Sequence, residues 1–188
     1  MNYKIILASN SPRRKALLEG LDIDFEVRVI PGIDESYPPD LIPEDIPVFI
    51  AQKKADAYRA SIQADELIIT ADTVVVLDGD IIEKPSDKSE AIQMLQRLSG
   101  RKHQVITAVT LTTIEQQKTF SVTSSVDFAV LTDNEIAYYV EQYKPYDKAG
   151  AYGIQEWIGY IGVRSIEGSF YNVMGLPIQR LYQELKNY

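Results

Sequence analysis

Near its start the chain reads Ile5-Ile6-Leu7-Ala8-Ser9-Asn10-Ser11-Pro12-Arg13-Arg14. The apolar residues predict a strand that runs into a turn, and Ser11 before Pro12 predicts the cap and the first position of a helix. The N–H groups and the positive dipole end at a helix start favour an anion. Two arginines in that first turn conflict with the dipole, and an anionic ligand such as a phosphate would resolve the conflict. The alternative is that both are surface residues or partners of carboxylates.

The composition indicates a globular protein with an acidic balance. Of 188 residues, 45% are hydrophobic and 24% are charged, and the formal net charge is −8. That charge argues against a nucleic-acid partner, which normally meets a basic face. The chain has no cysteine, which excludes a disulfide framework and agrees with the cytoplasmic location that we expect. We also expect no signal peptide, no bilayer-spanning segment and no membrane partner.

The periodicity of the rest of the chain predicts an α/β fold around one mixed sheet. A short apolar run over residues 67–71 predicts a buried strand that presents Asp72 and Thr73 at its end. Asp78-Gly79 predicts a hairpin turn between two apolar runs. Further strands are predicted over residues 23–29, 103–114 and 119–131, and helices over residues 12–20, 45–62, 87–100, 132–145 and from about 176. Thr132 with Glu135 predicts a capping box at the start of the helix over residues 132–145.

Residues 147–172 stand apart because they are rich in aromatic residues and glycine and have poor periodicity. That composition predicts binding loops and short strands rather than a plain core element. No linker that would separate two independently folding parts is visible, so we expect a single domain over residues 1–188.

Two carboxylates are candidates for chemistry. Asp72 is predicted at the end of a buried strand, and the carboxyl ends of strands in open α/β sheets are where ligands bind. A carboxylate at that point can bind Mg²⁺, orient a water molecule or act as a base. Glu35, in a loop that contains a glycine, is a candidate second metal ligand. The alternatives are a turn-capping role for Asp72 and a solvated loop charge for Glu35.

Three other polar residues can meet a nucleotide. Lys54 and Lys84 can reach a phosphate as point charges, and Lys84 is the better restrained because Pro85 follows it. The Gln155 amide offers both a donor and an acceptor, which suits the edge of uracil or thymine, although a solvated loop glutamine is the alternative. His103 is the single histidine, so a His-based zinc site is excluded and a structural polar contact is expected.

Four blocks of the sequence resemble the Maf proteins of the Maf/Ham1 (ITPase-like) superfamily of nucleoside triphosphate pyrophosphatases. They are Leu7–Arg14, Ala71–Val75 leading to Lys84-Pro85, Leu98–Val105 and Asp147–Gln155. The resemblance implies an elongated mixed β-sheet flanked by helices, with two lobes around a central cleft. It also implies hydrolysis of a nucleoside triphosphate to the monophosphate and pyrophosphate, with Mg²⁺ or Mn²⁺ as cofactor.

The resemblance also assigns roles to residues of this chain. It makes Asp72 the catalytic carboxylate and a metal ligand, and Glu35 a carboxylate near the metal. The positions that line the phosphates are Ser9, Arg13, Arg14, Lys54 and Lys84. The positions that mark the subgroup acting on dTTP and UTP, as opposed to 7-methyl-GTP, are Arg13, Thr73 and Gln155. Glu83 and Glu156 depart from the family pattern, because each stands where a glycine is common.

The sequence therefore predicts a dTTP/UTP pyrophosphatase whose partner is a nucleoside triphosphate, and it leaves a homodimer open. Asp72 would hold or deprotonate the attacking water, and a metal ion on Asp72 and Glu35 would bridge the phosphates. Arg13, Arg14 and Lys84 would stabilise the transition state. The alternative is a non-catalytic, nucleotide-binding regulator of cell division, since the resemblance includes a protein linked to septum formation. Such a regulator would not need Asp72.

Overall fold

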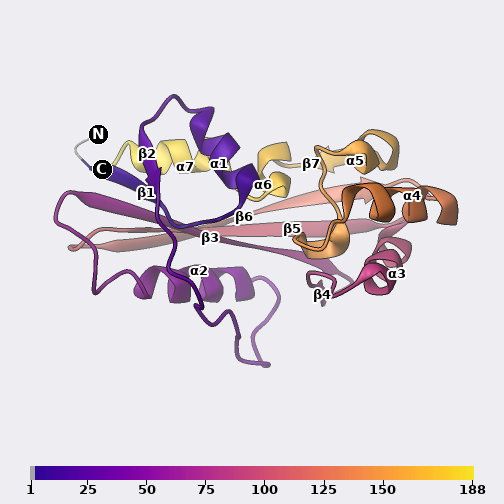
Figure 1. Ribbon diagram of the computed structural model, residues 1–188, viewed down its shortest axis with the longest axis horizontal. Coiled ribbons are helices and arrows are strands. Elements are labelled where there is room, and N and C mark those ends of the chain that lie inside the picture. The colour runs from indigo at the N-terminus through magenta and orange to yellow at the C-terminus, as the bar shows by residue number, and fades with distance from the viewer. Residues whose placement is uncertain (1–2) are drawn as a thin grey trace. The chain divides into compact units, whose positions relative to one another are not determined.

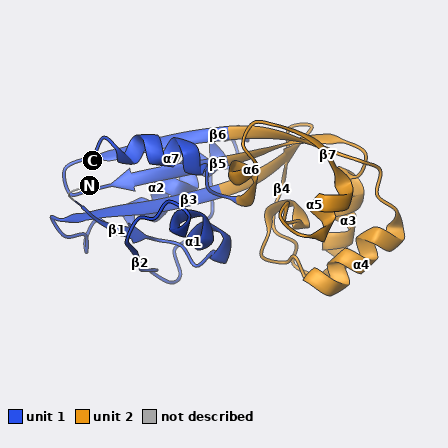
Figure 2. Cartoon of the chain, turned by 90° about the horizontal axis from the view of Figure 1, so that it is seen from above, with its two compact units in different colours: residues 1–72, 107–122, 175–188 blue, residues 73–106, 123–174 orange. Residues whose placement is uncertain are grey.

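The computed structural model describes residues 3–188 (Figure 1). The chain divides into two compact units, which Figure 2 colours separately. Unit 1 comprises residues 1–72, 107–122 and 175–188, and unit 2 comprises residues 73–106 and 123–174. Three strands contribute residues to both units, namely β3 (Glu66–Leu77), β5 (Lys102–Thr112) and β6 (Gln117–Phe128).

Unit 1 carries the N-terminal elements and the last helix. These are β1 (Lys4–Leu7), α1 (Pro12–Glu19), β2 (Phe25–Val27), α2 (Ile46–Asp56) and α7 (Ile178–Leu185). Within this unit α1 and α7 lie on one side of the strands and α2 on the other (Figure 1). Ile6, Ile68 and the Tyr58 ring form one buried cluster of the unit. The helix α2 ends earlier than the periodicity predicts.

Unit 2 contains the remaining helices and short strands. They are β4 (Asp80–Ile82), α3 (Lys88–Leu98), α4 (Asp133–Tyr143), the 3₁₀ turn η1 (Ala149–Ala151), α5 (Trp157–Gly162), β7 (Val163–Glu167) and α6 (Phe170–Met174). The prediction of binding loops over residues 147–172 is wrong in part. Tyr152, Ile154 and Ile158 are buried in the core cluster of this unit, so the aromatic and apolar residues of the segment serve packing as well.

The sheet has seven strands in the order β2-β1-β3-β5-β6-β7, with β4 paired to β3. The strand β1 runs parallel to both β2 and β3, whereas β3 with β4 and β6 with β7 are antiparallel. The sheet is therefore mixed and flanked by helices, which confirms the predicted fold class. No helix within residues 3–188 is both long enough and apolar enough to cross a bilayer.

The predicted turn and cap signals are present where they were expected. Ser11 caps α1, and Asp78 and Gly79 take positive φ angles of 53° and 87° in the turn between β3 and β4. In α4, Thr132 and Glu135 form a complete capping box.

One strand boundary corrects the prediction. Asp72 and Thr73 do not end a strand, because β3 continues through them to Leu77. The continuation has its own partner, since Val75 pairs with Ile82 of β4. The polar pair therefore lies inside a long strand.

Candidate functional site

The start of α1 is organised by two serine hydroxyls. The Ser11 Oγ accepts a hydrogen bond from the Arg14 backbone N–H at 3.4 Å, as a helix cap does. One turn earlier, the Ser9 Oγ accepts from the Ser11 backbone N–H at 3.2 Å. These contacts fix the path of the chain from β1 into α1, so the predicted helix start is confirmed.

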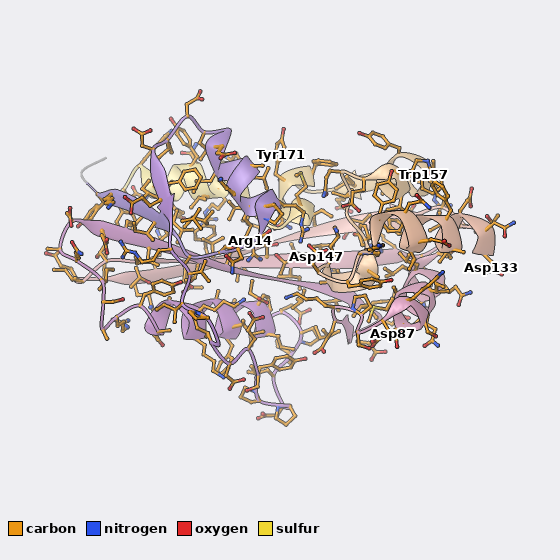
Figure 3. The ribbon with its side chains drawn as sticks, viewed as in Figure 1. Arg14, Asp87, Asp133, Asp147, Trp157 and Tyr171 are labelled. Carbon is orange, nitrogen blue, oxygen red and sulfur yellow. The ribbon has the colours of Figure 1, made fainter. Side chains whose placement is uncertain are left out.

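The Arg14 side chain, which is labelled in Figure 3, connects the helix start to two segments that are distant in the sequence. Its Nε donates to the carbonyl oxygen of Gly175 at 2.8 Å, and its Nη1 donates to the carbonyl oxygen of Ala71 at 2.9 Å. Burial lowers the pKa of the Arg14 guanidinium, while the nearby Asp72 carboxylate raises it. Arg14 therefore holds the backbone of β3 directly before Asp72. Residue types alone do not indicate this role, because the partners of Arg14 are backbone carbonyl oxygens far along the chain.

The Lys54 ammonium lies between the two predicted acidic residues. Its Nζ is 2.8 Å from the Asp72 Oδ1 and 3.1 Å from the Glu35 Oε1. The side chains of Asp72 and Lys54 are only 11% and 14% exposed, whereas Glu35 is 48% exposed. The structure thus brings together a loop carboxylate, a helix lysine and a strand carboxylate, all in unit 1.

The position of Asp72 relative to the strands shows why a ligand can bind beside it. The parallel ladder between β1 and β3 ends at the pair Leu7–Ile69, and the antiparallel ladder with β4 begins at Val75. Asp72 lies in the stretch between them, beyond the carboxyl end of β1. The rule that ligands bind at the carboxyl ends of parallel strands therefore applies through β1, although Asp72 does not end β3.

Arg13 is half-buried beside Arg14, whose pKa it lowers by charge repulsion. Ser9, Arg13, Arg14, Glu35, Lys54 and Asp72 all belong to unit 1. The other predicted site residues, Thr73, Lys84 and Gln155, belong to unit 2.

Lys84 is an exposed residue on a restrained piece of backbone. The carbonyl oxygen of Glu83, the residue before it, accepts a hydrogen bond from the Gly150 N–H at 3.1 Å. Gly150 has a φ of 71° and lies against Val75, where an added Cβ would be 3.0 Å from a methyl carbon, so only glycine suits this position. The family-like Gly150 therefore fixes the segment that carries Lys84.

Glu35 and Asp72 fit a divalent cation that is bound together with substrate. The two carboxylates already share one cationic partner, the Lys54 ammonium. Within residues 3–188 there is no group of three or more His, Cys, Asp or Glu side chains placed to hold a metal. Mg²⁺ is commonly bound by one or two carboxylates with substrate phosphates and waters rather than by an all-protein cage. The donor set present here is of that kind.

His103 makes the structural contact that was expected. Its Nε2 is 2.7 Å from the Tyr152 hydroxyl, and both residues are buried. Burial lowers the pKa of His103 to about 4, so the ring is neutral near pH 7.

A cluster in unit 2 was missed by sequence reasoning. The buried Lys148 ammonium lies 3.2 Å from the Glu156 carboxylate, and the Tyr139 hydroxyl donates to the same carboxylate. These residues surround the turn that carries Gln155. The signal that could have found the cluster is the charged Glu156 in an otherwise apolar and glycine-rich segment.

Comparison with known proteins shows to which family this chain belongs. The model of the Maf-like protein family matches residues 4–188, which is nearly the whole chain. The chain belongs to the Maf-like family. A family relative from Bacteroides thetaiotaomicron, named dTTP/UTP pyrophosphatase, is 61% identical over 98% of this chain and 95% of its own length. A relative of the same name from Phocaeicola vulgatus is 62% identical over the same shares.

A more distant relative and one solved structure are also similar to this chain. A protein from Cytophaga hutchinsonii, also named dTTP/UTP pyrophosphatase, is 47% identical over 98% of this chain and 84% of its own. The solved structure of a HAM1 protein from Coxiella burnetii aligns over 99% of this chain and 100% of its own, with a TM-score of 0.52 and 15% identity. At that identity the likeness concerns the fold, and it extends the Maf-like fold to Ham1 proteins.

Proposed function

We propose that this chain hydrolyses dTTP and UTP to the monophosphate and pyrophosphate. The proposal is supported by relatives of that name that match at 61% and 62% identity over almost the full length. The structural observation that carries the chemistry is the Lys54 ammonium held between Asp72 and Glu35. Cations and carboxylates in contact, beside a helix start, suit a substrate that brings four negative charges and a metal ion.

In this proposal Asp72 acts on the water molecule. Its carboxylate orients the water and takes its proton while the water oxygen forms a bond to phosphorus. The bridging P–O bond between the α- and β-phosphates breaks, and pyrophosphate leaves. Such a reaction needs positioning and charge neutralisation more than a covalent nucleophile. The carboxylate is placed for this task because Arg14 holds the carbonyl oxygen of Ala71, the residue directly before it, at 2.9 Å.

The cationic residues neutralise the phosphates. The cations that we assign to them are Arg13, Arg14 and Lys54 in unit 1 and Lys84 in unit 2, and the neutral Ser9 hydroxyl is assigned to the phosphates as a hydrogen-bond donor. Glu35 and Asp72 would hold Mg²⁺ or Mn²⁺, which when bound neutralises phosphate charge. Lys54 exchanges its carboxylate partners for phosphate oxygens when substrate enters.

Base selection is assigned to Arg13, Thr73 and Gln155. A glutamine amide can pair with the edge of uracil or thymine, because that edge offers both an N–H and carbonyl oxygens.

The absence of cysteine fits a reducing cytoplasm, where we expect the enzyme to act.

The deciding experiment measures pyrophosphate and orthophosphate separately from each common nucleoside triphosphate, with Mg²⁺ or Mn²⁺ present. We expect pyrophosphate from dTTP and UTP, little product from ATP and GTP, and no orthophosphate. If neither pyrimidine substrate is cleaved with either metal, the proposal is wrong. Tight dTTP binding without turnover would instead favour a non-catalytic, nucleotide-binding regulator of cell division.

A further inference from the structure

The turn that carries Gln155 is closed by one hydroxyl group. Residues 153–156 form a four-residue turn, in which the Glu156 N–H donates to the Gly153 carbonyl oxygen at 3.0 Å. The Tyr139 hydroxyl, from α4, accepts a hydrogen bond from the Gly153 N–H at 2.9 Å and donates to the Glu156 carboxylate. Tyr139 therefore contacts both the first and the last residue of the turn, with Gln155 between them.

The Glu156 carboxylate is held a second time by a buried lysine. The Lys148 side chain is 9% exposed, and its ammonium lies 3.2 Å from the Glu156 Oε1 and 2.8 Å from the Asp147 Oδ1. A buried ammonium is costly unless it is paired, so this contact fixes where the Glu156 carboxylate can lie. Both oxygens of Glu156 thus have a partner, one in Lys148 and one in Tyr139.

The Gln155 amide lies over the same glycine as the Glu156 carboxylate. A Cβ added to Gly153 would be 3.0 Å from the Gln155 Nε2 and 3.0 Å from the Glu156 Oε2. The amide nitrogen and the carboxylate oxygen are therefore at most about 6 Å apart, so the amino end of the amide lies near a fixed negative charge. Turning the amide over would bring its carbonyl oxygen to the carboxylate, and two acceptors would then repel each other.

The oxygen end of the Gln155 amide lacks a hydrogen-bond donor in the described part of the chain. The Gln155 Oε1 is buried and has no hydrogen-bond partner within residues 3–188. A buried carbonyl oxygen without a donor costs free energy, and such a group in a folded protein calls for an explanation. A ligand N–H would satisfy it.

We propose that Glu156, held by Lys148 and Tyr139, is a positioning residue that presents the Gln155 oxygen to the base and so selects uracil and thymine over cytosine. The inference rests on the proposed function and deepens it. Uracil and thymine carry a proton on N3, which can donate to that oxygen, whereas N3 of cytosine is an acceptor and would face it unpaired. A site built to accept a hydrogen bond discriminates strongly against an analogue that lacks the donor.

The test compares the binding of two uncleavable ligands, the α,β-imido analogues of UTP and CTP, by titration calorimetry with Mg²⁺. The wild type should prefer the UTP analogue. In Glu156→Gln, which removes the charge that orients the amide, we expect the preference to fall by about tenfold, the scale of one hydrogen bond to the base. Tyr139→Phe should shift the preference in the same direction. The control Glu167→Gln removes an exposed ion pair with Lys102 in the same unit and should leave the preference unchanged.

Steady-state kinetics separate positioning from general damage. For UTP hydrolysis by Glu156→Gln, we expect KM to rise while kcat changes far less, because base recognition is a binding effect. The inference is overturned if both Glu156→Gln and Tyr139→Phe keep the wild-type preference, or if the wild type binds the two analogues equally. If Glu156→Gln does not fold, Tyr139→Phe decides. A wild type that prefers the UTP analogue but releases no pyrophosphate would refute the proposed activity and leave this inference standing.

Discussion

Replacing Asp72 by asparagine tests the proposed catalytic role most directly. The change removes the negative charge and the basic oxygen but keeps the shape of the side chain. Because Asp72 lies inside β3 and is only 11% exposed, the backbone has little reason to move. Lys54 keeps its contact with Glu35 at 3.1 Å, so its ammonium is not left without a partner.

The expected effects on stability and turnover differ in size. Lys54 loses one of its two carboxylate partners and keeps the other. This loss should lower the free energy of unfolding by at most about 2 kcal/mol. For a chain of this length that lowers the melting temperature by roughly 8 °C or less. Loss of a general base or a main electrostatic group should lower kcat by about a hundredfold or more, which is about 2.7 kcal/mol in the activation barrier. The variant should therefore be folded and nearly inactive.

The assay is pyrophosphate release from dTTP at saturating substrate and metal, together with thermal unfolding of the same sample. A matched control is Asp78→Asn, because Asp78 is an exposed carboxylate paired with Arg101 in the turn between β3 and β4. Asparagine tolerates the positive φ of that turn, so the control should keep wild-type activity. Activity of Asp72→Asn within a few-fold of the wild type would remove Asp72 from the mechanism.

The remaining predictions concern residues whose contacts lie within unit 1. Arg14→Lys keeps the charge but cannot reach both carbonyl oxygens that Arg14 contacts, so kcat for dTTP should fall by about tenfold, whereas unchanged kinetics would contradict the role of Arg14. Tyr58→Phe removes a buried hydroxyl that joins the Ile30 N–H and the Arg28 carbonyl oxygen, and urea unfolding should show a loss of about 2 kcal/mol. The Arg28 guanidinium lowers the pKa of Glu66 below its ordinary value of 4.5. The ion pair between them therefore stabilises the fold above pH 4.5, and this stabilisation is lost as the pH falls through the lowered pKa. The stability gap between wild type and Glu66→Gln should therefore narrow in acid, and a constant gap in urea midpoints would refute this.

Features encoded in neighbouring residues were predicted well. The Ser11 cap, the Asp78-Gly79 turn and the capping box of Thr132 and Glu135 all depend on side chains within four positions of one another. Their geometry is local, so the pattern of residue types determines it. The order of helices and strands followed from these signals together with the apolar periodicity.

The misread strand boundary has a non-local cause. An apolar run interrupted by Asp72 and Thr73 has the pattern of a strand that ends there. In the structure the second half of β3 is stabilised by a different neighbour, β4, from the first half, which pairs with β1. The hairpin signal at Asp78-Gly79 predicts the partner of the second half, but nothing in the sequence indicates that the two halves form one continuous strand. The same limit applies to residues 147–172, whose buried aromatic residues depend on helices from other parts of unit 2.

For the candidate site, too, the sequence predicts individual residues, and only the structure shows their contacts. The resemblance selected Lys54, Glu35 and Asp72 one by one, but only the structure places the ammonium in contact with both carboxylates. Those contacts join a loop, a helix and a strand, and their spacing in the sequence has no regular pattern. Glu156 was noticed only as a departure from the family pattern, and its contacts with Lys148 and Tyr139 gave it a role.

The structure also changes the interpretation of the two arginines at the start of α1. Because cations are unfavourable at a helix start, the two arginines in the first turn of α1 together predict an anionic ligand there. The Arg14 side chain instead turns to the carbonyl oxygens of Ala71 and Gly175, whose partial negative charges offset its own. The conflict with the dipole is thus relieved within the protein at Arg14. The Ser11 and Arg14 N–H groups already donate to serine hydroxyls, so the case for an anion at this helix start rests on the dipole and on the charges of Arg13 and Arg14, and Arg14 also holds the backbone before Asp72.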